Sequence, residues 1–242
     1  MKISKKLKVL IILFMCGTTF FIYKYTNYNN ITYTVLGDGL SCGIDSYGRK
    51  TYSYGDYVKD YLTEKNKLKD YYKEYTKQDM TIEMLHNTLL TNQKKEYKYT
   101  NKNIKEILRE TDYLTMSIGI NDLLYLLTTT NELSEAKIDE IISEIEIKFN
   151  NLIQEIRKVY NREIYIIGYY DLNINNKLYK TAIKKLNNIY KKNNNVTYIS
   201  TYIISENKNI FLSNSMNYYP NYKGYQVIAS KIIDKISKKL EK

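Results

Sequence analysis

Apolar positions along this chain follow two patterns: short runs, and longer stripes with helical spacing. Short apolar or β-branched runs are typical of strands buried on both faces of a sheet. The expected strands are residues 31–36, 70–75, 112–118, 163–168 and 196–199. Between the runs, apolar residues recur at i, i+3 and i+4, which predicts amphipathic helices.

The clearest stripe covers residues 134–160, with shorter ones at 54–62, 81–90, 103–109 and 178–189 and a final helix after Tyr225. Strands that alternate with helices of this length predict a parallel sheet wrapped by helices. We therefore expect an α/β fold, a three-layer α/β/α sandwich formed by one domain over residues 31–242. No internal repeat or second domain is indicated.

The first 30 residues have a different pattern from the rest. Residues 1–8 are basic, residues 9–23 are apolar and residues 24–30 are polar. This arrangement predicts an N-terminal hydrophobic helix that acts as a signal anchor, with the domain outside the cytoplasm of a single-pass membrane protein. The alternatives are a cleaved signal, which gives a secreted protein, and a lipid anchor at Cys16.

Composition narrows the possible partners. The 242 residues carry a formal charge of +11, of which five lysines lie in residues 1–30, leaving +6 for the rest. The other lysines alternate with acidic residues, as on solvated helix faces, so attraction to a membrane or cell wall is favoured over nucleic-acid binding. The two cysteines offer neither a disulfide framework nor metal-ligand spacing, and no cofactor is indicated. The oligomeric state is left open.

Three blocks resemble the motifs of SGNH (GDSL-type) hydrolases. Residues 37–43 read Gly-Asp-Gly-Leu-Ser-Cys-Gly and resemble the block Gly-Asp-Ser-Leu-x-x-Gly. Residues 119–122 read Gly-Ile-Asn-Asp and match Gly-x-Asn-Asp. Residues 216–225 resemble Asp-x-x-His-Pro-Asn-x-x-Gly-Tyr. The resemblance runs from about residue 31 to the C-terminus and implies the SGNH hydrolase, flavodoxin-like fold.

The resemblance also implies a degenerate catalytic site. Gly39 stands in the place of the nucleophilic serine, Tyr219 in that of the histidine and Met216 in that of the aspartate. The second block begins at Gly119, and its Asn121 would supply an amide to the oxyanion hole; the simpler role for Asn121 is to cap the next helix. Acyl transfer needs a nucleophile, a base and an orienting carboxylate, so a catalytically impaired protein is expected.

Substitute residues are the alternative. Ser41 follows the vacant position and is a candidate nucleophile or a helix cap. Cys42 would need a partner such as His86, the only histidine. Asp79 stands where a glycine of the family's oxyanion hole belongs, and could form an acid–base pair with Tyr219. The alternative function is thus an active esterase or acylhydrolase on ester-linked envelope or lipid substrates.

The favoured hypothesis is a membrane-anchored, extracytoplasmic GDSL-family protein that binds a cell-envelope glycan, an acyl group or a partner. A purely structural or interaction module is a third possibility. The space above Gly39 separates these hypotheses: an open pocket favours ligand binding or catalysis, and a pocket filled by tyrosine favours an interaction module.

Overall fold

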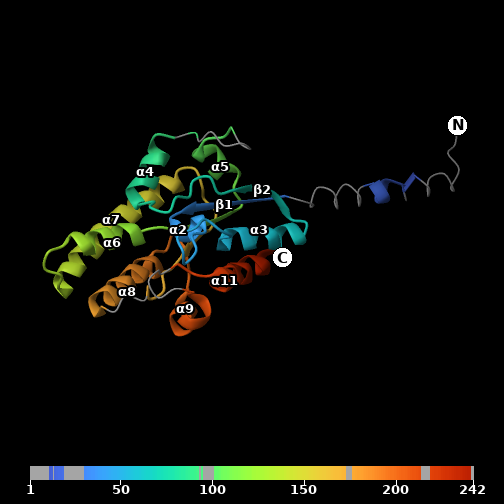
Figure 1. The fold of residues 1–242 in the computed structure, drawn as a ribbon. Helices are drawn as coiled ribbons and strands as arrows, with labels where there is room; N and C mark the ends of the chain where they lie inside the picture. The colour runs from blue at the N-terminus through green and yellow to red at the C-terminus, as the bar shows by residue number, and fades with distance from the viewer. Residues whose placement is uncertain are drawn as a thin grey trace, which may run out of the picture.

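A parallel five-stranded sheet with flanking helices forms the centre of the domain (Figure 1). The structure is a computed structural model that describes residues 11–12, 14–18, 30–92, 94, 101–172, 176–213 and 219–240. The strand order is β2-β1-β3-β4-β5. The strands are β1 (Ile31–Gly37), β2 (Leu68–Tyr72), β3 (Tyr113–Ser117), β4 (Ile164–Ile167) and β5 (Thr197–Ile199).

The helices fall into two groups that pack within themselves. The first contains α3 (Tyr54–Glu64) and α11 (Tyr222–Leu240), which contact each other. The second contains α4 (Ile82–Leu90), α6 (Ile120–Thr129), α7 (Glu135–Arg157) and α8 (Lys177–Lys192). Right-handed crossovers explain this division, because the step from β1 to β2 runs toward one edge of the sheet and the later steps run toward the other.

Four shorter helices complete the α/β domain as the structure describes it. They are α2 (Gly39–Cys42), α5 (Ile104–Glu110), α9 (Tyr202–Glu206) and α10 (Lys208–Phe211). The pattern of apolar residues did not predict α9 and α10, because helices of five and four residues are too short to show a stripe. Strand β2 also differs from expectation: it begins at Leu68 and ends at Tyr72, and residues 74–75 form a turn.

The core lies wholly within the α/β domain. Every residue of β1, β3 and β4 is buried except Tyr113, which is half-buried. The stripe of α7 faces this sheet-centred core through buried residues from Ile138 to Ile156. Apart from the small cluster of Cys42, Ile44 and Tyr219, the buried apolar side chains form one cluster that begins at Ile31 and ends at Ile236. Residues 31–242 therefore contain a complete core.

The expected N-terminal helix lies largely outside the described residues. Residues 11–12 and 14–18 are helical. Within the described residues, no helix is both long and apolar enough to cross a membrane.

Candidate active site

The first block lies at the carboxyl end of β1, between the ends of β2 and β3, where open α/β sheets form their ligand crevices. Gly37 ends the strand with φ at 115°. A Cβ on Gly37 would overlap the backbone carbonyl of Ser117, so only glycine allows β1 and β3 to approach this closely. The next turn is short: the Asp38 carboxylate accepts the backbone N–H of Leu40 at 3.1 Å and caps α2.

Tyr219 occupies the space above Gly39. The Tyr219 ring atoms Cζ and Cε1 lie 2.6 and 2.7 Å from the position that a Gly39 Cβ would take, and the phenol oxygen lies closer still. Tyr219 is 7% exposed and packs with Cys42 and Ile44. The structure thus brings together the two positions to which the resemblance assigns the family's serine and histidine. Because the phenol fills the serine's place, the two positions enclose no open pocket.

A buried hydrogen-bond network lies beneath this contact. Asp38 is fully buried and accepts hydrogen bonds from Ser117 Oγ at 2.6 Å and from the phenol of Tyr169. Burial raises the pKa of the Asp38 carboxyl to about 6, although these hydrogen bonds favour its charged form. Burial, with the charge of Asp38 as the next cause, raises the pKa of Tyr169 well above its usual value. Asp38 therefore acts as a buried structural acceptor in this fold.

Ser41 belongs to the same network. Its Oγ lies 2.7 Å from Ser117 Oγ and 2.6 Å from the phenol oxygen of Tyr54, and the side chain is fully buried. The Ser41 hydroxyl therefore points into the core, where a substrate has no access. The helix cap also differs from expectation, since Asp38 caps α2 and Ser41 does not.

The second block holds the segment before α4 in place. The Asn121 side-chain amide donates hydrogen bonds to the backbone carbonyls of Gln78 and Met80, at 3.0 and 2.9 Å. The Asp122 carboxylate accepts the backbone N–H of Ile82, at 3.0 Å from its nearer oxygen. Gly119 precedes α6 with φ at 107°. An amide has two donor hydrogens, so both of those on Asn121 are engaged in this contact. Asn121 does not cap α6 with its side chain.

The other candidates are spread around this edge of the sheet. Asp79 is exposed and forms an ion pair with Lys77 at 3.1 Å. His86 is half-buried within α4, and Cys42 is buried beside Tyr219. Met216 lies outside the described residues.

The matched residues of the third block serve the start of α11. The Asn221 side chain accepts the backbone N–H of Gly224 at 3.0 Å. A Cβ on Gly224 would come within 2.6 Å of Pro220. The phenol of Tyr225 donates to the carbonyl of Ile44 at 2.6 Å, which ties α11 to the loop after α2. These four residues have structural roles in the described contacts.

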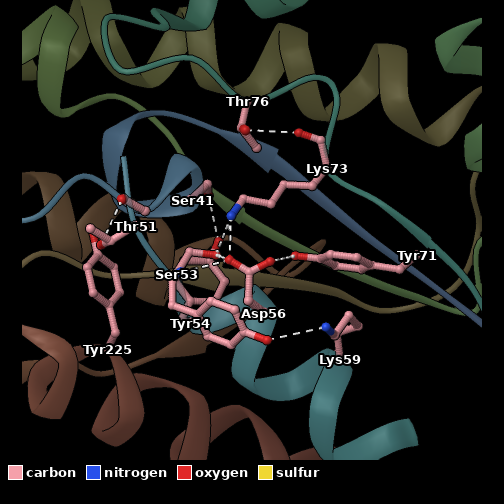
Figure 2. Close-up of polar contacts among 12 residues, drawn as sticks. Ser41, Thr51, Ser53, Tyr54, Asp56, Lys59, Tyr71, Lys73, Thr76 and Tyr225 are labelled. Atoms are coloured by element: carbon pink, nitrogen blue, oxygen red, sulfur yellow. Dashed lines mark hydrogen bonds and ion pairs between the residues drawn. The ribbon is translucent and has the colours of Figure 1, made fainter. Parts of the chain in front are cut away.

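A second polar cluster, which the motifs did not reveal, lies where β2 ends and α3 begins (Figure 2). Lys73 Nζ donates to Ser53 Oγ at 2.9 Å and to Asp56 Oδ2 at 2.5 Å, and Tyr71 donates to the same carboxylate at 3.0 Å. The Asp56 pKa is lowered: burial opposes this, but the charge and hydrogen bond of Lys73 outweigh it. The spacing of 17 residues between Lys73 and Asp56 is no sequence signal.

The surface beside Gly39 has little open space, because the Tyr219 ring fills it. The hollow between Tyr219, Tyr169 and Leu172 measures only about 10 Å³, close to the space of one water molecule. Larger hollows lie beside it: about 470 Å³ between Lys50 and Tyr71, and about 230 Å³ between Tyr47 and Tyr222. Within the described residues, no group of three or more His, Cys, Asp and Glu side chains is placed to hold a metal ion.

Comparison with known proteins identifies one matching family. The sequence profile of the GDSL-like Lipase/Acylhydrolase family matches residues 33–232. A search of the curated proteins found no match.

Solved structures share the fold. The lipase Lip_vut3 from a goat rumen metagenome is 19% identical with a TM-score of 0.67, over 84% of this chain and 95% of that one. The acetylxylan esterase Axe2 of Geobacillus stearothermophilus is 15% identical with a TM-score of 0.59, over 87% of this chain and 95% of its own. Catalytic mutants of Axe2, with a serine, an aspartate or a histidine changed to alanine, match to a similar degree.

Proposed function

This chain belongs to the GDSL-like lipase/acylhydrolase family, and we propose that it is a catalytically impaired member of that family. We propose further that it acts by binding. The observation that carries the proposal is the Tyr219 ring in the space above Gly39. In this family's chemistry that space holds the nucleophile and the acyl carbon it attacks. A phenol with an ordinary pKa near 10 is a poor general base at neutral pH.

Two further observations support impairment. Both donor hydrogens of Asn121 are engaged by backbone carbonyls, so this amide offers no donor to an oxyanion. Ser41, the candidate substitute nucleophile, is buried against Tyr54 and Ser117. Losing triad members costs on the order of 10⁴–10⁶ in rate. The filled pocket thus disfavours both an active esterase and ligand binding above Gly39, and it favours a protein that binds through its surface.

The surface beside the closed site offers a place for a cell-envelope glycan. The hollows of about 470 and 230 Å³ share the lining residues Thr51 and Tyr52, and we call the two hollows together the groove. Tyr47, Tyr52 and Tyr222 line it and are 65, 43 and 62% exposed. Aromatic rings with polar neighbours suit ligands that combine apolar and hydroxyl-bearing faces, as sugars do.

The N-terminal segment completes the proposal. Residues 1–30 would anchor the protein in the membrane, with residues 31–242 as an extracytoplasmic domain. Cell fractionation of a tagged full chain tests this part. Recovery in the cytoplasmic soluble fraction would contradict it, and release of a shortened form would indicate a cleaved signal.

Hydrolysis of short aryl esters tests the catalytic part. We expect the full chain to turn over 4-nitrophenyl acetate no faster than its Asn121→Ala variant. The triple change Gly39→Ser, Met216→Asp and Tyr219→His should introduce turnover, because it restores all three reacting groups. Turnover by the unchanged protein that Ser41→Ala or Cys42→Ala abolishes would overturn the proposal.

Binding of a solubilised cell-wall glycan tests the groove. Tyr52→Ala should weaken retention of that glycan by roughly tenfold if the ring contributes ~1.4 kcal/mol. The matched control is Tyr202→Ala, a tyrosine 62% exposed that does not line the groove. Equal retention by both variants would contradict a role for the groove.

A further inference from the structure

The edge of the sheet opposite the closed site is strongly basic. Strand beginnings and helix ends meet there, in residues 63–69, 109–113, 157–163, 191–197 and 235–240. We call these segments the basic edge. They contain twelve lysines and arginines against four acidic residues, a net charge of +8. Since residues 31–242 carry +6 in all, the rest of the domain is slightly negative.

Helix capping explains only part of this excess. Cations stabilise the carboxyl ends of helices, and Arg109, Arg157, Lys192 and Lys239 lie in such last turns. Lys67 and Arg162 lie in the loops beyond the helix ends, where the effect of the helix dipole has faded.

Several of these cations face solvent without a counter-charge. Lys65, Lys192 and Lys238 are exposed, and none of them forms an ion pair with a described residue. Others are paired: Lys158 with Glu155 at 2.5 Å, for example. The unpaired cations keep the edge positive.

A hollow of about 570 Å³ opens on the same edge. Lys67, Arg162 and Lys239 line it together with Asn30 and Ile31. Asp112 and Glu163 also line it and form ion pairs with Arg162 and Lys239, so the free positive charge of this edge lies on the unpaired lysines around the hollow. Asn30 and Ile31 are where the chain enters the domain, so the segment proposed as the anchor joins the domain at the basic edge. Figure 1 shows the C-terminus close to the same end of the molecule.

We propose that the basic edge docks on a membrane surface rich in anionic lipid headgroups. This inference rests on the proposed anchor, because a polar linker of residues 24–30 reaches at most ~25 Å when fully extended. It therefore keeps the domain near the bilayer, where an anionic surface attracts basic residues within a Debye length. Docking in this orientation turns Gly39, Tyr219 and the tyrosine-lined groove away from the bilayer, toward the cell envelope.

The test uses residues 31–242, which contain the complete core, with phosphatidylcholine vesicles that contain or lack phosphatidylglycerol. We expect the domain to sediment with the anionic vesicles alone, and to be released by high salt. The triple variant Lys65→Gln, Lys192→Gln and Lys238→Gln should lose about 100-fold in partitioning, at roughly fivefold per cation.

The matched control removes the same charge from the opposite edge. Lys50, Lys177 and Lys223 are exposed and form no ion pair with a described residue, and their triple change to Gln should leave partitioning nearly unchanged. An equal loss in both triple variants would mean that net charge alone acts, and would overturn the docking edge. Absence of vesicle binding by the unchanged domain would also overturn it. Neither result depends on ester turnover, so failure here is distinct from failure of the proposed function.

Discussion

The Tyr219 ring lies where any side chain on Gly39 would project, with Cζ 2.6 Å from the position of that Cβ. Atoms in folded proteins do not approach so closely, because repulsion rises steeply below van der Waals contact. The Tyr219 ring can therefore keep this position only while residue 39 is glycine. A serine at position 39 requires that the ring at position 219 move.

This dependence predicts a double-mutant cycle. Gly39→Ser should lower the free energy of unfolding by about 1–3 kcal/mol, as overpacking does. The same change in a Tyr219→Ala background should cost clearly less, because the ring is gone. Urea denaturation of the four proteins measures the coupling. An equal cost of Gly39→Ser in both backgrounds would show that the ring does not occupy this space.

Asp38 predicts an inverse pH dependence of stability. Its pKa is about 6 in the folded protein against 3.8 for a free carboxyl, so between these values the folded state holds a proton that the unfolded chain has lost. The stabilisation is thus complete below about pH 4 and is lost as the pH rises through about 6, by about 3 kcal/mol in all.

Asp38→Asn should remove this slope, since an amide cannot titrate. Urea midpoints measured from pH 4 to 7 provide the check. Asp79→Asn is the control, because the Asp79 side chain is 69% exposed and its loss should leave the slope intact. A slope that survives Asp38→Asn would assign the titration to another group.

Asn121 predicts a loss of stability. Asn121→Ala leaves the carbonyls of Gln78 and Met80 without their donor, which should cost about 1–3 kcal/mol. Thermal unfolding against Asn131→Ala, a change at an exposed asparagine, isolates the effect. An unchanged melting temperature would indicate that the Asn121 amide is held in place without contributing to stability.

Breaking the ion pair of Lys73 and Asp56 should lower the free energy of unfolding more than breaking an ion pair at the surface. Both side chains are 15% exposed, so Lys73→Met leaves a largely desolvated carboxylate and should cost about 3 kcal/mol. Lys148→Met, at a pair that is 36 and 49% exposed, should cost no more than about 1 kcal/mol. Chemical denaturation at neutral pH compares them, and a similar cost for both would contradict the role of burial.

Much of the fold could be predicted from residue patterns. The stripe from Ile138 to Ile156 specified α7, and the continuous run of β1 specified a strand buried on both faces. Short elements were missed because α9 and α10 span about one turn each. The boundaries of β2 were missed because only Tyr72 of its five residues is buried, so no apolar run marks them.

The site was harder to predict than the fold. The resemblance indicated that Gly39, Asn121 and Tyr219 belong to one site, yet the direction of the Tyr219 ring depends on packing that no motif encodes. Tyr169 forms a hydrogen bond with Asp38, and Tyr54 forms one with Ser41. These are two among 28 tyrosines and have no distinctive neighbours in sequence. Such partners are recognised only when the chain is folded.

The close approach of Gly37 to the Ser117 backbone affects how gene function is assigned from sequence motifs. Gly37 meets a steric requirement and Asp38 caps a turn, so both would be kept by selection for folding alone, whether or not hydrolysis persists. A sequence search that uses the Gly-Asp pair therefore finds proteins that share the fold, whether or not they share the activity. The residue that follows the pair is the one to inspect before a gene is assigned an enzymatic role.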